Sequence, residues 1–178
     1  GFSGKIYPVN PKGGTILGLT TFERIDLIPD QVETAIICTP APKVVEIMQQ
    51  CAKKGVRAAI IISGGFSEEG EDGRRLEETI VKIAKRADIR VVGPNTTGVL
   101  NTASGFTSSW FGDVPMRMGG VALIAQTGNF AGVLLEYIMT NRLFGISSVA
   151  GLGNKCDVNE TDVLEYVLED PRSKIVMM

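Results

Sequence analysis

Short apolar runs alternate along the chain with segments whose apolar residues recur every three or four positions. The runs that predict buried strands in the first part of the chain are residues 5–9, 35–38, 58–62 and 89–92. Helical spacing marks residues 44–51 and 76–87. Pro40 and Pro42 favour a helix start, because a proline in the first turn gives up no intrahelical hydrogen bond. This alternation predicts an α/β fold around a parallel sheet.

The pattern lapses over residues 101–120, which are rich in Ser, Thr, Gly and aromatic residues, and resumes after them. The later strands are expected at residues 121–125, 146–150 and 174–178, and the later helices at residues 130–138 and 163–168. We therefore expect one domain over residues 1–112, a connection over residues 113–120 and the start of a second α/β domain over residues 121–178.

Composition excludes several classes of function. With 18 Lys and Arg against 20 Asp and Glu, the net charge is −2, and no basic block points to nucleic acid or to an anionic membrane. The longest apolar runs have the length of strands, far below a membrane span. Cys38, Cys51 and Cys156 form no CxxC pair, and their odd number fits a reducing cytoplasm better than a disulfide framework. The chain has no His, and we expect no metal site in it.

Gly and Pro gather where the predicted strands end, which is where open α/β sheets bind their ligands. These ends are residues 9–14, 38–42, 62–66 and 93–98. Tight βα turns also favour Gly and Pro, so each end taken alone fits either a turn or a ligand contact. Four such ends in succession favour a backbone that approaches a ligand closely.

Five segments resemble the NDP-forming acyl-CoA synthetases, and they occur in the same order. They are KIYPVNPK (5–12), ISGGFSEEGEDGRRLE (62–77), GPNTTGVLN (93–101), VALIAQTG (121–128) and GNKCDV (153–158). That family includes the ADP-forming acetyl-CoA synthetases and is related to the α subunit of succinyl-CoA synthetase. The resemblance implies a Rossmann-like parallel sheet that binds CoA, followed by the first part of a flavodoxin-like domain.

The resemblance also implies which residues contact CoA. They are Lys12, Pro40, Ala41, Ile62, Ser63, Gly64, Pro94, Asn95 and Thr96. Lys12 would lie at the nucleotide end of CoA, where an ammonium group suits phosphate. The family often has Cys where Thr96 stands.

A phosphate site is implied at Thr127, Gly128 and Asn129, which follow a predicted strand and open a predicted helix. In the family this turn faces the phosphoryl group. A helix N-terminus offers unpaired N–H groups and about half a positive charge, which favours an anion. Simple capping of the helix by Thr127 or Asn129 is the alternative.

The function implied for the parent protein is a reversible ligase. It would convert an acid, CoA and NTP into acyl-CoA, NDP and phosphate through an acyl phosphate and a phosphohistidine. The implied partners are a small carboxylic acid and an ATP-grasp domain or β subunit that binds ATP or GTP with Mg, and we expect an oligomer. Because the chain has neither His nor a GxGxxG loop, we expect that the first βα unit and the catalytic-histidine region are missing and that this piece is inactive alone.

Two rival functions compete with the ligase. One is a non-catalytic regulatory module that binds CoA or acyl-CoA, for example fused to an acetyltransferase. The other is an NAD dehydrogenase, which requires the dinucleotide fingerprint and an acidic residue after the second strand. That strand ends in Thr39 and Pro40, which argues against the dehydrogenase.

Overall fold

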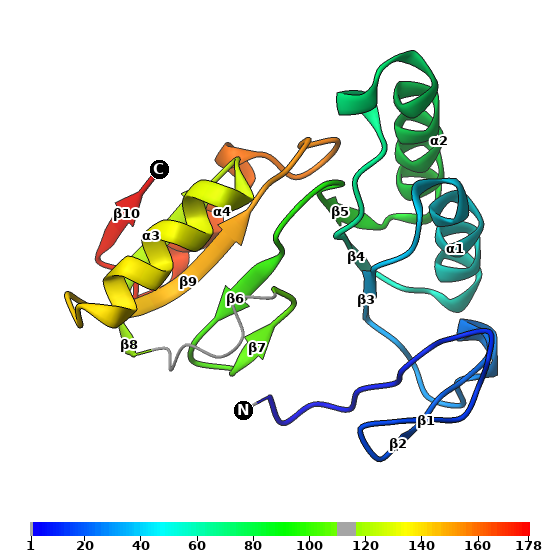
Figure 1. Ribbon diagram of the computed structural model, residues 1–178, viewed down its shortest axis with the longest axis horizontal. Coiled ribbons are helices and arrows are strands. Elements are labelled where there is room, and N and C mark those ends of the chain that lie inside the picture. Colours follow the sequence, from blue (N-terminus) through cyan, green and yellow to red (C-terminus); the bar gives the residue numbers. More distant parts are fainter. Residues whose placement is uncertain (1, 110–116) are drawn as a thin grey trace.

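The protein contains two main sheets, each with its own helices (Figure 1). A computed structural model describes residues 2–109 and 117–178. The first sheet is parallel, in the order β3-β4-β5, with β3 (Thr34–Ile37), β4 (Ala58–Ile61) and β5 (Arg90–Val92). The second sheet has the order β10-β8-β9-β6-β7. The predicted α/β fold is confirmed.

Two helices cover the first sheet, α1 (Ala41–Lys54) and α2 (Glu71–Ala87), and they pack side by side (Figure 1). Pro40 is the N-cap of α1 and Pro42 lies in its first turn, as predicted. Val44, Met48 and Cys51 recur at helical spacing and are completely buried, so they form the face of α1 that packs into the core. Two short 3₁₀ helices, η1 (Ile25–Leu27) and η2 (Ser67–Glu69), complete this part.

The second sheet is built on β8 (Met118–Ala125), with β9 (Ile146–Gly151) and β10 (Ile175–Met177) parallel to it on either side. α3 (Gly128–Thr140) connects β8 to β9, and α4 (Glu160–Glu169) connects β9 to β10. Because the two connections lead to opposite sides of β8 and parallel crossovers are right-handed, α3 and α4 cover opposite faces of the sheet. The strands and helices predicted here are confirmed, although β8 begins at Met118 instead of residue 121.

Two strands of the second sheet that the sequence did not predict lie at the start of the segment expected to be aperiodic. β6 (Val99–Asn101) pairs antiparallel with β9, and β7 (Phe106–Thr107) pairs antiparallel with β6. Strands of two or three residues are too short to show an alternating pattern, and these two lie among Ser, Thr, Asn and Gly residues that indicate a loop. Residues 113–116 of the expected connection lie outside the described residues, and the division at residues 112 and 120 stays a prediction.

The strand predicted at residues 5–9 is wrong. Only Val9 makes a β-bridge, to Phe22, and most of the segment is exposed. A strand needs a hydrogen-bonded neighbour, and the nearby pair β1 (Thr15–Ile16) and β2 (Leu19–Thr20) bonds only within itself. β3 is also less buried than expected, since it lies at an edge of its sheet and Ile36 is 45% exposed.

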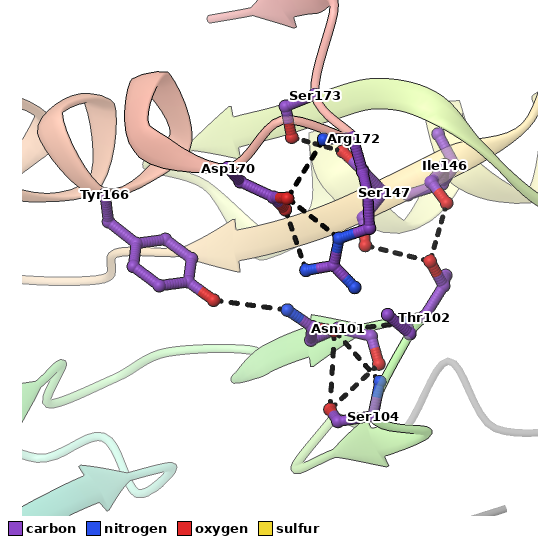
Figure 2. Close-up of polar contacts among 10 residues, drawn as sticks. Asn101, Thr102, Ser104, Ile146, Ser147, Tyr166, Asp170, Arg172 and Ser173 are labelled. Atoms are coloured by element: carbon purple, nitrogen blue, oxygen red, sulfur yellow. Dashed lines mark hydrogen bonds and ion pairs between the residues drawn. The ribbon is translucent and has the colours of Figure 1, made fainter.

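Polar contacts fasten the β6–β7 hairpin at the amino end of β9 (Figure 2). Asn101 donates from Nδ2 to the Tyr166 hydroxyl at 3.2 Å, and Thr102 donates from Oγ1 to the carbonyls of Ile146 and Ser147, both at 2.9 Å. The Arg172 guanidinium beside Asp170 lowers the pKa of that carboxyl. Because ligands of parallel sheets bind at the carboxyl ends of the strands, we assign this cluster to folding.

Candidate functional site

The loops that follow β3, β4 and β5 are tied together at one edge of the first sheet. Parallel registers bring the carboxyl ends of the three strands to the same edge. Ser63 donates from Oγ to the carbonyl of Thr39, and the amide of Asn95 donates to the carbonyl of Ser63 at 2.8 Å. A ligand at this edge therefore meets three loops that hold one another in place.

The start of α1 lies beside the glycine turn that follows β4. A β-carbon on Gly65 would stand 3.1 Å from that of Ala41, and one on Gly64 would stand 3.2 Å from Asn95 Oδ1. Pro40, Gly64 and Asn95 are exposed. The structure thus brings together the segments in which most of the CoA contacts were expected.

Ile62 and Ser63 are half-buried in this group, and the side chain of Pro94 is buried. Thr96 is only 3% exposed and is fully engaged within the protein. Its hydroxyl donates to the carbonyl of Gly151 at 2.6 Å and accepts from the amide of Gly98 at 2.9 Å. Thr96 therefore has a structural role, and any CoA contact at this position would be made without its hydroxyl.

Lys12 lies apart from the group. Its exposed side chain is on the turn before β1, and its amide donates to Asn10 Oδ1 at 3.0 Å. None of the hydrogen bonds within residues 2–109 and 117–178 joins Lys12 to the strand ends.

The N-terminus of α3 touches the loop that follows β5. Thr127 is the N-cap residue, but its side chain makes no capping hydrogen bond, so the predicted alternative of capping by Thr127 is wrong. A β-carbon on Gly128 would lie 1.9 Å from Thr97 Cγ2, so only glycine permits this approach. Asn129 lies in the first turn of α3. The first turn of α3 thus lies next to the edge where the three loops meet.

Thr97 has a buried hydroxyl, and within the described part of the chain that hydroxyl has no hydrogen-bond partner. The side chain is 8% exposed and lies against both Gly128 and Gly151. It therefore acts as the contact between the loop after β5, the start of α3 and the end of β9.

The segment after β9, residues 152–158, joins the two sheets, and we call it the bridging loop. The amides of Asn154, Cys156 and Val158 donate to the carbonyls of Pro94, Gly93 and Val91 at 2.9, 3.1 and 3.0 Å. The bridging loop therefore lies along the end of β5, at Val91, and along the loop that follows β5, at Gly93 and Pro94.

Charged groups strengthen the same junction. Asp157 accepts from Arg90 Nε at 3.0 Å and from the amide of Val91 at 2.7 Å, and Arg90 also reaches Asp162 at 2.9 Å. Burial, followed by the charges of Glu77 and Asp157, raises the pKa of Cys156 to about 12, so its thiol stays protonated. Cys156 and Asp157 belong to a segment with family resemblance, and their contacts here are structural.

Glu68 and Asn154 are part of this junction, and sequence reasoning missed both. Glu68 accepts from the amides of Gly65 and Phe66 at 2.6 and 3.2 Å and from Asn154 Nδ2 at 2.5 Å. Burial alone would raise the pKa of Glu68, but these hydrogen bonds outweigh it, so the pKa lies below its usual value. Glu68 stands within the segment ISGGFSEEGEDGRRLE, which carries part of the family resemblance, but the sequence indicated no role for it.

Comparison with known proteins decides the family to which this architecture belongs. Residues 3–102 match the family model described as the CoA binding domain. The chain belongs to the CoA-binding domain family. Residues 118–178 match the model described as the succinyl-CoA ligase like flavodoxin domain. The strand-end loops described above therefore lie within the CoA-binding domain, and α3 and the bridging loop lie within the flavodoxin-like part.

The resemblance to NDP-forming acyl-CoA synthetases is confirmed by relatives that match along nearly the whole chain. Identity is 46% over 177 residues to the ADP-forming acetate–CoA ligase II of Archaeoglobus fulgidus, covering 99% of this chain and 26% of that protein. Identity is 35% over 182 residues to the α subunit of the ADP-forming acetate–CoA ligase I of Pyrococcus furiosus, covering 100% of this chain and 39% of that subunit. The chain therefore spans only a part of these relatives.

A solved structure supports the same relationship. The dinucleotide-forming acetyl-coenzyme A synthetase 1 of Ca. Korarchaeum cryptofilum, in complex with phosphate and ADP, matches with a TM-score of 0.93 at 35% sequence identity. The match covers 99% of this chain and 37% of that one.

Other classes of site find no support in the described residues. Residues 2–109 and 117–178 contain no group of three or more Cys, Asp or Glu arranged to hold a metal ion. None of the helices in these residues has the length and hydropathy required to cross a membrane.

Proposed function

We propose that this chain is the CoA-binding portion of an ADP-forming acyl-CoA ligase. The observation that carries the proposal is the meeting of the three strand-end loops with the N-terminus of α3 at Thr97 and Gly128. A CoA thiol held at these loops would stand beside helix amides suited to phosphate. The parent would exchange acyl-CoA and phosphate for acyl phosphate and CoA, and pass the phosphoryl group to ADP elsewhere.

The proposed CoA contacts are those implied by the resemblance, with a more precise role for several of them. Backbone groups of Ile62, Ser63 and Gly64 line the cofactor together with Pro40 and Ala41, and Pro94 and Asn95 contact its pantetheine arm. Thr96 holds the loop through Gly151 and Gly98. The remaining proposed contacts are Lys12 for CoA phosphate and Thr127, Gly128 and Asn129 for the transferred phosphate.

The partners proposed for the parent are a small carboxylic acid and an ATP-grasp domain or β subunit that binds the nucleotide with Mg. The Pyrococcus relative is named as an α subunit, which supports a second polypeptide or domain. We further propose an oligomeric parent in the cytoplasm, where the free thiols of Cys38, Cys51 and Cys156 would stay reduced.

Lys12→Glu in the full-length protein is expected to weaken CoA binding about tenfold or more, because an acidic side chain would replace a phosphate partner by a like charge. Calorimetry with CoA measures this, and Lys82→Glu, an exposed reversal on α2, is the matched control. Tight binding of NAD without binding of CoA would contradict the proposed function.

This chain alone is expected to form no phosphoprotein, because the family carries the phosphoryl group on His and the chain has none. Incubation with CoA, acetate and γ-labelled ATP, followed by electrophoresis and assay of acyl-CoA, tests the expectation. A labelled band at 19.1 kDa would overturn it.

A further inference from the structure

Asn154 places one amide side chain between three groups of the CoA-binding domain. Its Nδ2 donates to Glu68 Oε2 at 2.5 Å and to Glu77 Oε2 at 2.9 Å, and its Oδ1 accepts from Asn95 Nδ2 at 3.4 Å. Ser67 Oγ also lies 3.2 Å from this nitrogen, but an amide nitrogen carries only two hydrogens, and its two shorter contacts are those to the carboxylates. Both N–H groups and the oxygen of the Asn154 amide therefore bond to the CoA-binding domain, although Asn154 belongs to the bridging loop.

Glu68 transmits this contact to the glycine turn. One carboxylate oxygen accepts from Asn154, and the other accepts from the amides of Gly65 and Phe66. A β-carbon on Gly64 would lie 3.1 Å from the same oxygen, so the carboxylate lies directly against the turn. The turn is thereby held by a charge-assisted bond, which is stronger than one between neutral groups.

Glu77 fixes the other side of the cluster. Its Oε2 accepts from Ser67 Oγ at 2.8 Å and from the amide of Ser67 at 3.3 Å. η2, which begins at Ser67, is thus fastened to α2 at the point where Asn154 arrives. The carboxylates of Glu68 and Glu77 therefore face the Asn154 amide, and an acidic residue at position 154 would place a third carboxylate beside them.

We propose that Glu68 and Asn154 are positioning residues for CoA, through which the bridging loop of the flavodoxin-like part holds the glycine turn and Asn95 in their binding geometry. This inference rests on the proposed function, since it takes the turn and Asn95 as CoA contacts. It assigns a role in CoA affinity to Asn154, which lies outside the matched CoA-binding domain.

The test uses the full-length protein and calorimetry with CoA as the probe. Glu68→Ala and Asn154→Ala are each expected to weaken CoA binding about tenfold, since each removes a hydrogen bond to a charged group. Because the two residues share one hydrogen bond, the loss of CoA affinity in Glu68→Ala/Asn154→Ala should be smaller than the product of the two single losses. Glu69→Ala is the control, an exposed neighbour whose carboxylate makes none of the hydrogen bonds found in the described residues.

A charge-specific rescue separates positioning from general damage to the fold. Asn154→Asp has nearly the same shape but places a third carboxylate beside Glu68 and Glu77, so CoA binding should weaken more than in Asn154→Ala. Adding Glu68→Gln removes one negative charge. The amide oxygen of the substituted side chain can still accept from the amides of Gly65 and Phe66, and its NH₂ group can donate to the carboxylate at position 154. CoA affinity should then rise above that of Asn154→Asp, while repulsion between Glu77 and the carboxylate at position 154 keeps it below the wild-type value.

Three outcomes would overturn the inference while the proposed function stands. They are wild-type CoA affinity in both alanine variants, losses that multiply in the double variant, and no recovery when Glu68→Gln is added to Asn154→Asp. If the wild-type protein itself fails to bind CoA, the proposed function is what fails.

Discussion

Gly153→Ala is expected to lower the free energy of unfolding by about 3–4 kcal/mol, among the larger effects of a single substitution. Gly153 has a φ of 61°, and a β-carbon there would lie 2.2 Å from the carbonyl oxygen of Pro94 and 2.6 Å from that of Asn95. Both obstacles are backbone atoms, so no side chain can rotate away. The bridging loop would have to move away from the loop that follows β5.

Gly55→Ala is the matched control for this prediction. Gly55 ends α1 with a φ of 77°, and a β-carbon there would meet nothing within 4 Å. Gly55→Ala should lower the free energy of unfolding only by the strain of an alanine in the left-handed conformation, about 1 kcal/mol. Thermal or urea unfolding of both variants gives the comparison, and equal losses would show that the contact of Gly153 with Pro94 has no energetic importance.

Gly128→Ala is expected to reduce phosphate-dependent turnover of the full-length enzyme by about a hundredfold, the typical cost of a misplacement near 1 Å. The added β-carbon would collide with Thr97 Cγ2 at 1.9 Å and push the first turn of α3 away from the strand-end loops. CoA affinity should change less than turnover, because the amides offered to phosphate are those of α3. Steady-state rates and calorimetry measure the two quantities.

Thr97→Ser provides the compensating change, since it removes the Cγ2 methyl and leaves contacts of 3.2 and 3.3 Å. Gly128→Ala/Thr97→Ser should recover turnover to within about tenfold of wild type, because the β-carbon points at Thr97 and the amides stay in place. If turnover and CoA affinity fall together in Gly128→Ala, or neither changes, the phosphate role proposed for this turn is wrong.

The helices that the sequence predicted correctly are those with enough residues to show a period. Val44, Met48 and Cys51 revealed α1 because each faces the core one helical turn further along. β6 and β7 had no comparable signal, since strands this short are stabilised by their partner β9 and not by their own composition. Residues 5–9 had a strand-like composition without the neighbour that a strand requires.

The candidate site likewise contains residues that the sequence could predict and residues that it could not. The strand ends were predictable because parallel strands finish at one edge, and Pro40, Ser63 and Asn95 follow three such strands. Glu68 and Asn154 were not predictable, because their bond joins positions that only the fold brings together. Thr96 was assigned to CoA by its neighbours in the motif, and burial directs its hydroxyl to Gly151 instead.

The hydrogen bonds between β5 and the bridging loop bear on the order in which the chain folds during synthesis. β5 ends at Val92, but the amide and the carbonyl of Val91 find their partners only when Asp157 and Val158 have left the ribosome. Until then the nascent first sheet presents an unpaired edge, and such edges template aggregation. The long sequence separation also slows closure of this contact relative to the local helices. Translation of the flavodoxin-like part thus completes the first sheet as well as adding the second.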